Sequence, residues 1–160
     1  MRESPDSRIR PTQARVRKSI FQRLEPWDGL TVCDLYAGIG SLGIEALSRG
    51  AARVTFVDHD SRAVALVAAN LERLQDRGRC EVINDDALAF LAGNRRRFDV
   101  VLADPPYGSI SWEALSSEAQ LALAPGGRFV MELPSRAETP AEIDTRRYGK
   151  TKVCIAWKIS

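Results

Sequence analysis

Apolar positions along the chain fall into two alternating patterns. Short runs rich in β-branched residues are typical of buried strands, and segments with an apolar residue every three or four positions are typical of helices. The predicted strands are Thr31–Tyr36, Arg53–Val57, Glu81–Ile83, Phe98–Ala103, Arg128–Leu133, Arg146–Tyr148 and Lys152–Lys158. The predicted helices are Pro11–Leu24, Leu42–Ser48, Ser61–Gln75, Ala87–Leu91 and Trp112–Leu123. This alternation predicts a single α/β domain over residues 10–160, with a doubly wound, mostly parallel sheet and an antiparallel C-terminal hairpin.

The first 24 residues differ from the rest of the chain. Residues 1–9 show no periodicity, and we expect a disordered tail there. Beyond them Val16, Ile20 and Leu24 recur every four positions, and Pro11 suits a first helical turn. The predicted helix therefore has one apolar face, and its other faces are basic.

One strand ends in an unusual tetrapeptide, Asp104-Pro105-Pro106-Tyr107. Proline fixes φ and has no N–H, so the loop is rigid and its carbonyls stay free to accept hydrogen bonds. A carboxylate, a carbonyl and an aromatic ring therefore meet at the carboxyl end of a buried strand. This combination suits binding of a planar amino group attached to a ring.

A glycine-rich turn follows the first predicted strand. Gly38, Gly40 and Gly43 form G-x-G-x-x-G between a strand and a helix, and Asp58 ends the next strand. These features match the dinucleotide fingerprint of Rossmann-like folds, in which an acid binds ribose hydroxyls. In such folds the ligand lies beyond the carboxyl ends of the strands, where the Asp104 loop is also expected.

Asp34 helps to decide which nucleoside binds there. A carboxylate near the turn would repel a pyrophosphate but would attract the ammonium and sulfonium groups of S-adenosylmethionine. Asp86, at the start of a short helix, is placed to bind the adenine amino group, with Asp85 as the alternative. We include Tyr36 and Ala87, which flank these positions, in the predicted cofactor site.

Composition limits the class of protein. The chain has 160 residues, of which 44% are hydrophobic and 28% are charged, as in soluble globular proteins. No apolar stretch is long enough to cross a membrane, and the N-terminus lacks a signal-peptide core, so we expect a cytoplasmic protein. Three widely spaced cysteines and one histidine predict no metal site and no disulfide framework.

Basic residues are clustered although the net charge is only +2. Residues 1–24 contain seven basic and two acidic side chains, and further clusters lie at Arg95–Arg97 and near the C-terminus. Charge runs are usually solvated surfaces, but three clusters on a nearly neutral protein favour a polyanionic partner.

These motifs together resemble a known family. D-P-P-Y beside a glycine loop resembles class I S-adenosylmethionine-dependent methyltransferases that modify amino nitrogens of nucleic acid. More specifically, the chain is similar to bacterial 16S rRNA (guanine-N2) methyltransferases over about residues 10–158. The matching stretches are Arg10-Pro11-Thr12 with Arg15-Val16-Arg17, Glu45–Ala51, and Tyr148-Gly149-Lys150-Thr151.

The resemblance implies a function and roles for residues. Asp104 and the Pro105 carbonyl would accept the N–H groups of guanine N2, and Tyr107 would stack on the extruded base. Pro106 completes the implied catalytic loop. The implied RNA-binding residues are Arg10, Thr12, Arg15 and Arg17. The implied partner is 16S rRNA or an assembling small ribosomal subunit, bound by a monomer that needs no metal.

Other functions remain open from the sequence. The family usually has a basic β-hairpin before the R-P-T segment, and only nine residues precede Arg10 here. The motif also suits an amino-methyltransferase acting on DNA or on a protein glutamine. A nicotinamide-dependent oxidoreductase would share the glycine loop, and an inactive methyltransferase-like RNA-binding module would share the whole fold.

Overall fold

The structure, a computed structural model, describes the backbone of residues 11–158 and the side chains from Ala14 onward. The predicted tail, residues 1–9, lies outside the described residues, and so does Arg10. The helices are α1 (Pro11–Arg23), α2 (Ser41–Ser48), α3 (Ser61–Leu74), α4 (Ala87–Gly93) and α5 (Trp112–Ala122), with a 3-10 turn at Arg77–Arg79. The strands are β1 (Thr31–Leu35), β2 (Arg53–Asp58), β3 (Cys80–Asn84), β4 (Phe98–Ala103), β5 (Leu123–Pro134), β6 (Asp144–Tyr148) and β7 (Thr151–Trp157).

The strands form one seven-stranded sheet in the order β3-β2-β1-β4-β5-β7-β6. The first five in this order are parallel, and β7 runs antiparallel to both β5 and β6. The predicted fold class is therefore confirmed. The hairpin turn is also where it was predicted, between Tyr148 and Thr151.

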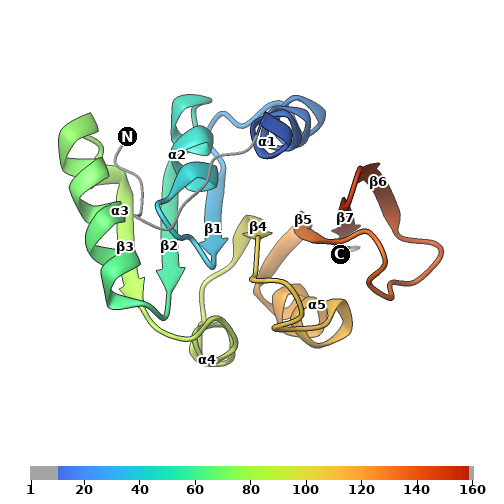
Figure 1. The fold of residues 1–160 in the computed structure, drawn as a ribbon. Helices are drawn as coiled ribbons and strands as arrows, with labels where there is room; N and C mark the ends of the chain where they lie inside the picture. The colour runs from blue at the N-terminus through green and yellow to red at the C-terminus, as the bar shows by residue number, and fades with distance from the viewer. Residues whose placement is uncertain (1–10, 159–160) are drawn as a thin grey trace.

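Helices cover both faces of the sheet, as Figure 1 shows. α1, α2 and α3 share one apolar cluster with residues of the strands, and α4 and α5 share a second cluster on the opposite face. Residues of one strand alternate between the clusters: Val100 and Leu102 of β4 belong to the first, and Val101 and Ala103 to the second. This burial of both faces explains why the central strands are almost continuously apolar.

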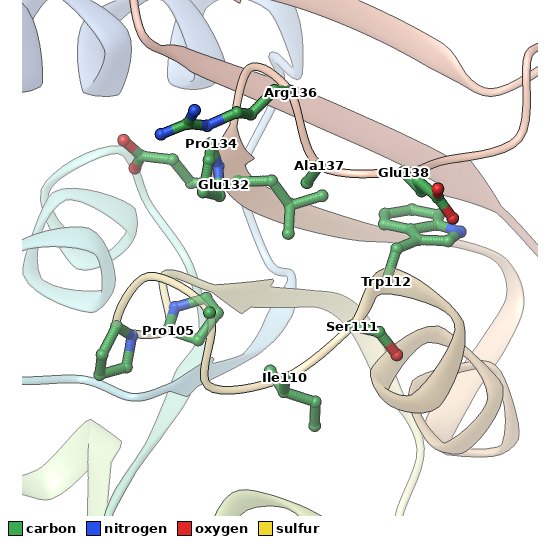
Figure 2. Close-up of a pocket in the computed structure, with 12 residues that line it drawn as sticks. Pro105, Ile110, Ser111, Trp112, Glu132, Pro134, Arg136, Ala137 and Glu138 are labelled. Atoms are coloured by element: carbon green, nitrogen blue, oxygen red, sulfur yellow. The ribbon is translucent and has the colours of Figure 1, made fainter.

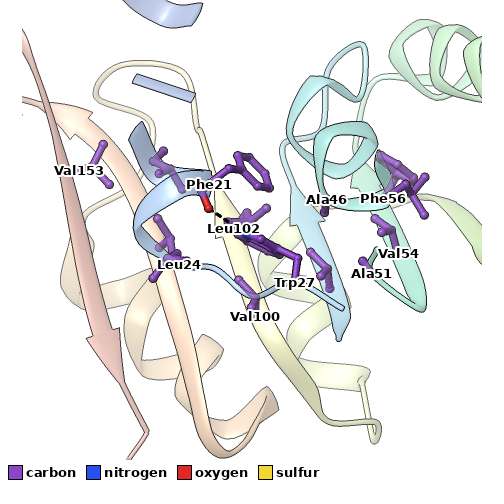
Figure 3. Packing of buried hydrophobic residues seen from close by; sticks show 14 of the residues in the cluster. Phe21, Leu24, Trp27, Ala46, Ala51, Val54, Phe56, Val100, Leu102 and Val153 are labelled. Atoms are coloured by element: carbon purple, nitrogen blue, oxygen red, sulfur yellow. Dashed lines mark hydrogen bonds between the residues drawn. The ribbon is translucent and has the colours of Figure 1, made fainter. Parts of the chain in front are cut away.

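Helix α1 packs on the sheet through the face that its sequence predicts. Val16, Ile20 and Leu24 are all buried, and Phe21 joins them in the same cluster (Figure 3). Trp27 packs against the Phe21 ring and donates its indole N–H to the Phe21 carbonyl at 2.9 Å. Burial of this large aromatic pair fixes the end of α1 against the sheet.

Polar contacts join α1 to the C-terminal hairpin. Arg23 forms an ion pair with Asp144 of β6, and Ser19 is hydrogen-bonded to the Tyr148 hydroxyl. The N-terminal helix and the last two strands, far apart in sequence, therefore support each other.

The start of β5 differs from the sequence prediction. A turn was expected at Pro125-Gly126-Gly127, but β5 already begins at Leu123 and contains these residues. The register with β4 jumps between Phe98 and Val100, so the extra residues form a bulge. The bulge keeps its backbone paired, because Gly126 N–H donates to the Lys158 carbonyl and Lys158 N–H donates to the Gly127 carbonyl.

Candidate active site

The strand order reverses between β1 and β4, and this creates a crevice at the carboxyl edge of the sheet. β1 leads into α2 on one face, whereas β4 leads into α5 on the other. Leu35 pairs with Ala103, so Tyr36 and Asp104 follow directly at neighbouring strand ends. The two motifs found in the sequence therefore meet at the switch point.

The glycine loop after β1 needs its glycines for different reasons. Gly38 and Gly40 have φ values of 59° and 88°, in the left-handed region. A Cβ on Gly43 would lie 2.3 Å from Cε1 of Phe56, so only glycine lets α2 approach the sheet this closely. Around Gly38, by contrast, no atom lies within 4 Å of the position of a Cβ, which leaves room for a ligand beside the backbone.

Two acids hold this loop in place. The Asp58 carboxylate accepts hydrogen bonds from the backbone N–H groups of Gly38 and Asp60, both at 2.9 Å. Asp34 is buried and accepts from the Gly43 N–H at 2.9 Å. Both predicted cofactor-binding acids thus also shape the loop, and binding of ribose by Asp58 stays a prediction.

The crevice concentrates negative charge. Burial, the strongest influence, raises the pKa of Asp34 well above its usual value; the Gly43 N–H opposes this, and the charges of Asp104 and Asp58 add to it. Three carboxyl groups from three adjacent strands therefore interact electrostatically across the switch point. Such a site suits a cationic ligand better than a pyrophosphate, as the presence of Asp34 predicted.

The N-terminus of α4 follows β3 at the same carboxyl edge of the sheet. Asp86 caps this helix by accepting from Ala89 N–H at 3.0 Å, and Asp85 accepts from Asp86 N–H at 2.8 Å. Burial and then the Asp86 charge raise the pKa of Tyr36, so these two predicted residues interact. Ala87 is buried, and its side chain packs into the second apolar cluster.

The loop after β4 presents the groups that its sequence predicts. Tyr107 is 63% exposed, and its hydroxyl lies 3.0 Å from Oγ1 of Thr151, the first residue of β7. Both the N–H and the hydroxyl of Ser109 donate to the Pro106 carbonyl. Among the described residues none donates to the Pro105 carbonyl, which therefore remains available as an acceptor.

Sequence reasoning missed Glu132. Met131 pairs with Ala103, so Glu132 lies beside Asp104. Burial and then the Asp104 charge raise the pKa of Glu132 to about 8, and burial raises the pKa of Asp104 to about 6. The sequence does contain a sign of its importance, because Glu132 is an acid within the otherwise apolar run F-V-M-E-L.

A cavity of about 370 Å³ lies beside this pair. Pro105 and Pro106 line one side, and Glu132 and Pro134 of β5 line the other, with Trp112 of α5 at one end (Figure 2). The cavity is thus next to the acceptor loop and not next to the glycine loop.

The predicted RNA-binding residues are only partly described. Arg15 is exposed and Arg17 is half-buried on α1, but nothing is described of the Thr12 side chain. None of the described hydrogen bonds joins Arg15 or Arg17 to the crevice, so their role stays a prediction.

Two further findings concern the described residues alone. No group of three or more histidine, cysteine or acidic side chains in this part of the chain is arranged to hold a metal ion. Its helices are also too short or too polar to span a membrane.

The family model described as "Conserved hypothetical protein 95" matches residues 2–157. The chain belongs to this family. A relative in Bacillus subtilis, YlbH, is named as a candidate rRNA methyltransferase and is 38% identical over 91% of this chain and 86% of its own length. Ribosomal RNA small subunit methyltransferase D of Haemophilus influenzae is 43% identical over 62% of this chain, which spans about half (53%) of that protein. The resemblance identified in the sequence is thus confirmed at the level of the family.

The fold is that of S-adenosylmethionine-dependent methyltransferases. A 16S rRNA N2 G1207 methyltransferase of T. thermophilus, solved with AdoMet and guanosine, matches with a TM-score of 0.79 over 96% of this chain and 44% of that one. The identity is 23%, so the likeness concerns the fold. The predicted cofactor agrees with this fold and with the family.

Proposed function

We propose that this protein transfers a methyl group from S-adenosylmethionine to the exocyclic N2 of a guanine in 16S rRNA. The observation that carries the proposal is the position of the Asp104-Pro105-Pro106-Tyr107 loop, directly beside the glycine loop at the strand switch point. Family membership and the small-subunit rRNA activity named for the H. influenzae relative support the same conclusion.

The glycine loop and its acids would hold the cofactor. The open space at Gly38 lets a nucleoside approach the backbone, and the carboxyl groups of Asp34 and Asp58 complement positive charge. When bound, S-adenosylmethionine supplies a methyl group activated by the adjacent sulfonium. The main task of the protein is therefore to position the methyl group and the acceptor amine, because the methyl group is already activated.

The acceptor loop would prepare the amine. The lone pair of guanine N2 is delocalised into the ring, so the amine is a weak nucleophile. Asp104 and the Pro105 carbonyl would each accept one N–H, which turns the nitrogen lone pair toward the methyl group. The new N–C bond would form as the methyl–sulfur bond breaks, and the electron pair of that bond would stay on sulfur. Asp104 would receive the proton that the nitrogen loses and pass it to solvent.

The exposed Tyr107 ring would bind the base. Taking a base out of its stack is least costly in single-stranded RNA, and stacking on an aromatic ring stabilises it by roughly 1–3 kcal/mol. The guanosine bound by the T. thermophilus enzyme is consistent with such an acceptor. We propose that exposed basic residues, including Arg15 of α1 and Lys150 of the hairpin turn, bind RNA phosphates, and that the protein acts as a cytoplasmic monomer.

Nucleoside analysis after methyl transfer tests the proposal. Small ribosomal subunits that lack the modification are incubated with radiolabelled S-adenosylmethionine, and the 16S rRNA is digested and separated. We expect the label in N2-methylguanosine. Label in a methylated adenine, in duplex DNA or in added protein would contradict the proposed acceptor.

Calorimetry tests the cofactor separately. We expect S-adenosylmethionine and S-adenosylhomocysteine to bind and NAD not to bind. Binding of NAD alone would exclude the methyltransferase mechanism and favour an oxidoreductase.

A further inference from the structure

Glu132 is a partly exposed acid between two buried apolar residues of β5. Its neighbours Met131 and Leu133 are buried in the second apolar cluster. Met131 pairs with Ala103 of β4, so Glu132 and Asp104 are the next residues of two adjacent parallel strands. The backbone register alone therefore brings the two acids together.

The two carboxyl groups need a proton between them. The strand register places them side by side, and two ionised carboxylates held this close repel each other. A carboxyl pair in such contact titrates in two separate steps, because the first charge disfavours the second. At neutral pH the pair therefore carries one proton and one negative charge.

The surroundings do not offer another way to neutralise the pair. The nearby acids Asp34 of β1 and Asp58 of β2 bring no positive charge to the crevice. Arg136 of the loop after β5 lies at the same cavity (Figure 2), yet no basic side chain among the described residues forms an ion pair with either acid. On β7, Lys152 donates instead to the Ala137 carbonyl and the Thr139 hydroxyl, both at 2.7 Å.

We propose that Glu132 is a positioning residue that, as a neutral acid, donates a hydrogen bond to Asp104 and fixes this carboxylate for the acceptor amine. The inference rests on the proposed methyl transfer. The proton is placed on Glu132 because that residue is only partly exposed, whereas Asp104 is exposed, and water stabilises the charge of an exposed carboxylate better. One oxygen of Asp104 is thereby held by Glu132, and the other is left to accept an N–H of the substrate.

Substitutions that keep or remove the donor test the role. Glutamine retains an N–H donor and cannot ionise, so we expect Glu132→Gln to keep kcat within about threefold of the wild type at pH 7.5. Glu132→Ala removes the donor and should lower kcat more than tenfold, with the affinity for S-adenosylmethionine unchanged by calorimetry. Glu142→Ala, an exposed acid of the loop between β5 and β6, is the control and should match the wild type.

The pH profile separates positioning from packing. In the wild type, kcat should fall at acid pH as Asp104 is protonated and at alkaline pH as Glu132 ionises. With the same substrate, kcat of Glu132→Gln should still fall at acid pH but should no longer fall at alkaline pH. Wild-type activity of Glu132→Ala, or equal losses and equal profiles in the two Glu132 variants, would overturn the proposal.

A readout without turnover distinguishes this inference from the proposed function. Carbon-13 NMR is recorded on protein labelled at the glutamate side-chain carboxyls. The resonance of Glu132 is the one that is missing from the spectrum of Glu132→Gln. We expect this carboxyl to stay protonated through neutral pH, even if no rRNA substrate is methylated. Titration of Glu132 like an exposed glutamate would overturn the inference and leave the proposed methyl transfer intact.

Discussion

The two sides of the crevice hold their acids in different ways. On the β1 side, Asp34 and Asp58 each bind backbone N–H groups of the glycine loop that they support. On the β4 side, Asp104 lies beside another acid, Glu132, whose pKa burial and then the Asp104 charge raise to about 8. The first arrangement is fixed by the backbone, whereas the second depends on protonation. We infer that the cofactor side depends mainly on the shape of the glycine loop, and the acceptor side on the protonation of its two acids.

Replacement of Asp104 gives the sharpest test of this difference. Asp104→Ala removes the proposed acceptor for the substrate amine, and losses of about 10²- to 10⁴-fold are typical for such groups. We therefore expect methyl transfer to fall by at least about a hundredfold, measured by label incorporation into 16S rRNA. The calorimetric Kd for S-adenosylmethionine should change by less than several-fold. A parallel loss of cofactor affinity would show that the two sides are not independent.

The cofactor side should respond to a change in shape. In Gly43→Ala the new methyl group would lie 2.3 Å from the Phe56 ring, so α2 has to move away from the sheet. Overpacking of this kind costs about 1–3 kcal/mol, and we expect the free energy of unfolding, measured in urea, to fall by that amount. Gly93→Ala at the end of α4 is the control, because no atom there lies within 4 Å of the added Cβ. Equal effects of the two substitutions would mean that the close approach of α2 is not required.

This difference also explains what could be predicted from the sequence. The glycine loop is encoded locally: Gly38, Gly40 and Gly43 lie within six residues, and Asp58 follows at the end of the next strand. Periodicity likewise identified the inward face of α1, because one helix face repeats every few residues. Such signals predicted the sheet, the helices and the positions of both loops.

Contacts between side chains of different strands could not be predicted from local sequence patterns. Glu132 meets Asp104 only because β5 pairs with β4 in one register, and that register includes the bulge at Pro125-Gly126-Gly127. The sequence predicted a simple turn there, since proline and glycine usually end strands. Knowledge of the bulge was needed to place Glu132, so the acceptor side was predicted only in part.

The dependence of stability on pH should report the protonation of Glu132 in the folded protein. The folded protein raises the pKa of Glu132 above its unfolded value of about 4.3, so its contribution to stability is present below that pH and is lost as pH rises toward about 8. Glu132→Gln does not titrate and should therefore gain Tm relative to the wild type between pH 5 and pH 9. A shift of about 2–4 °C corresponds to 1 kcal/mol in a domain of this size. A constant difference in Tm across this range would mean that Glu132 is ionised in the folded protein.

Tyr107→Phe should have the smallest effect, because it changes the acceptor loop without changing its charge. The variant loses an exposed hydrogen bond to Thr151 but keeps the ring that we propose stacks on the base. We expect kcat and the KM for rRNA to change by less than about threefold, since an exposed hydrogen bond contributes about 1 kcal/mol or less. Tyr107→Ala removes the ring as well, and loss of roughly 1–3 kcal/mol of stacking should raise the KM about tenfold. If phenylalanine were as damaging as alanine, the acceptor side would require the contact of Tyr107 with Thr151 and not its stacking on the base.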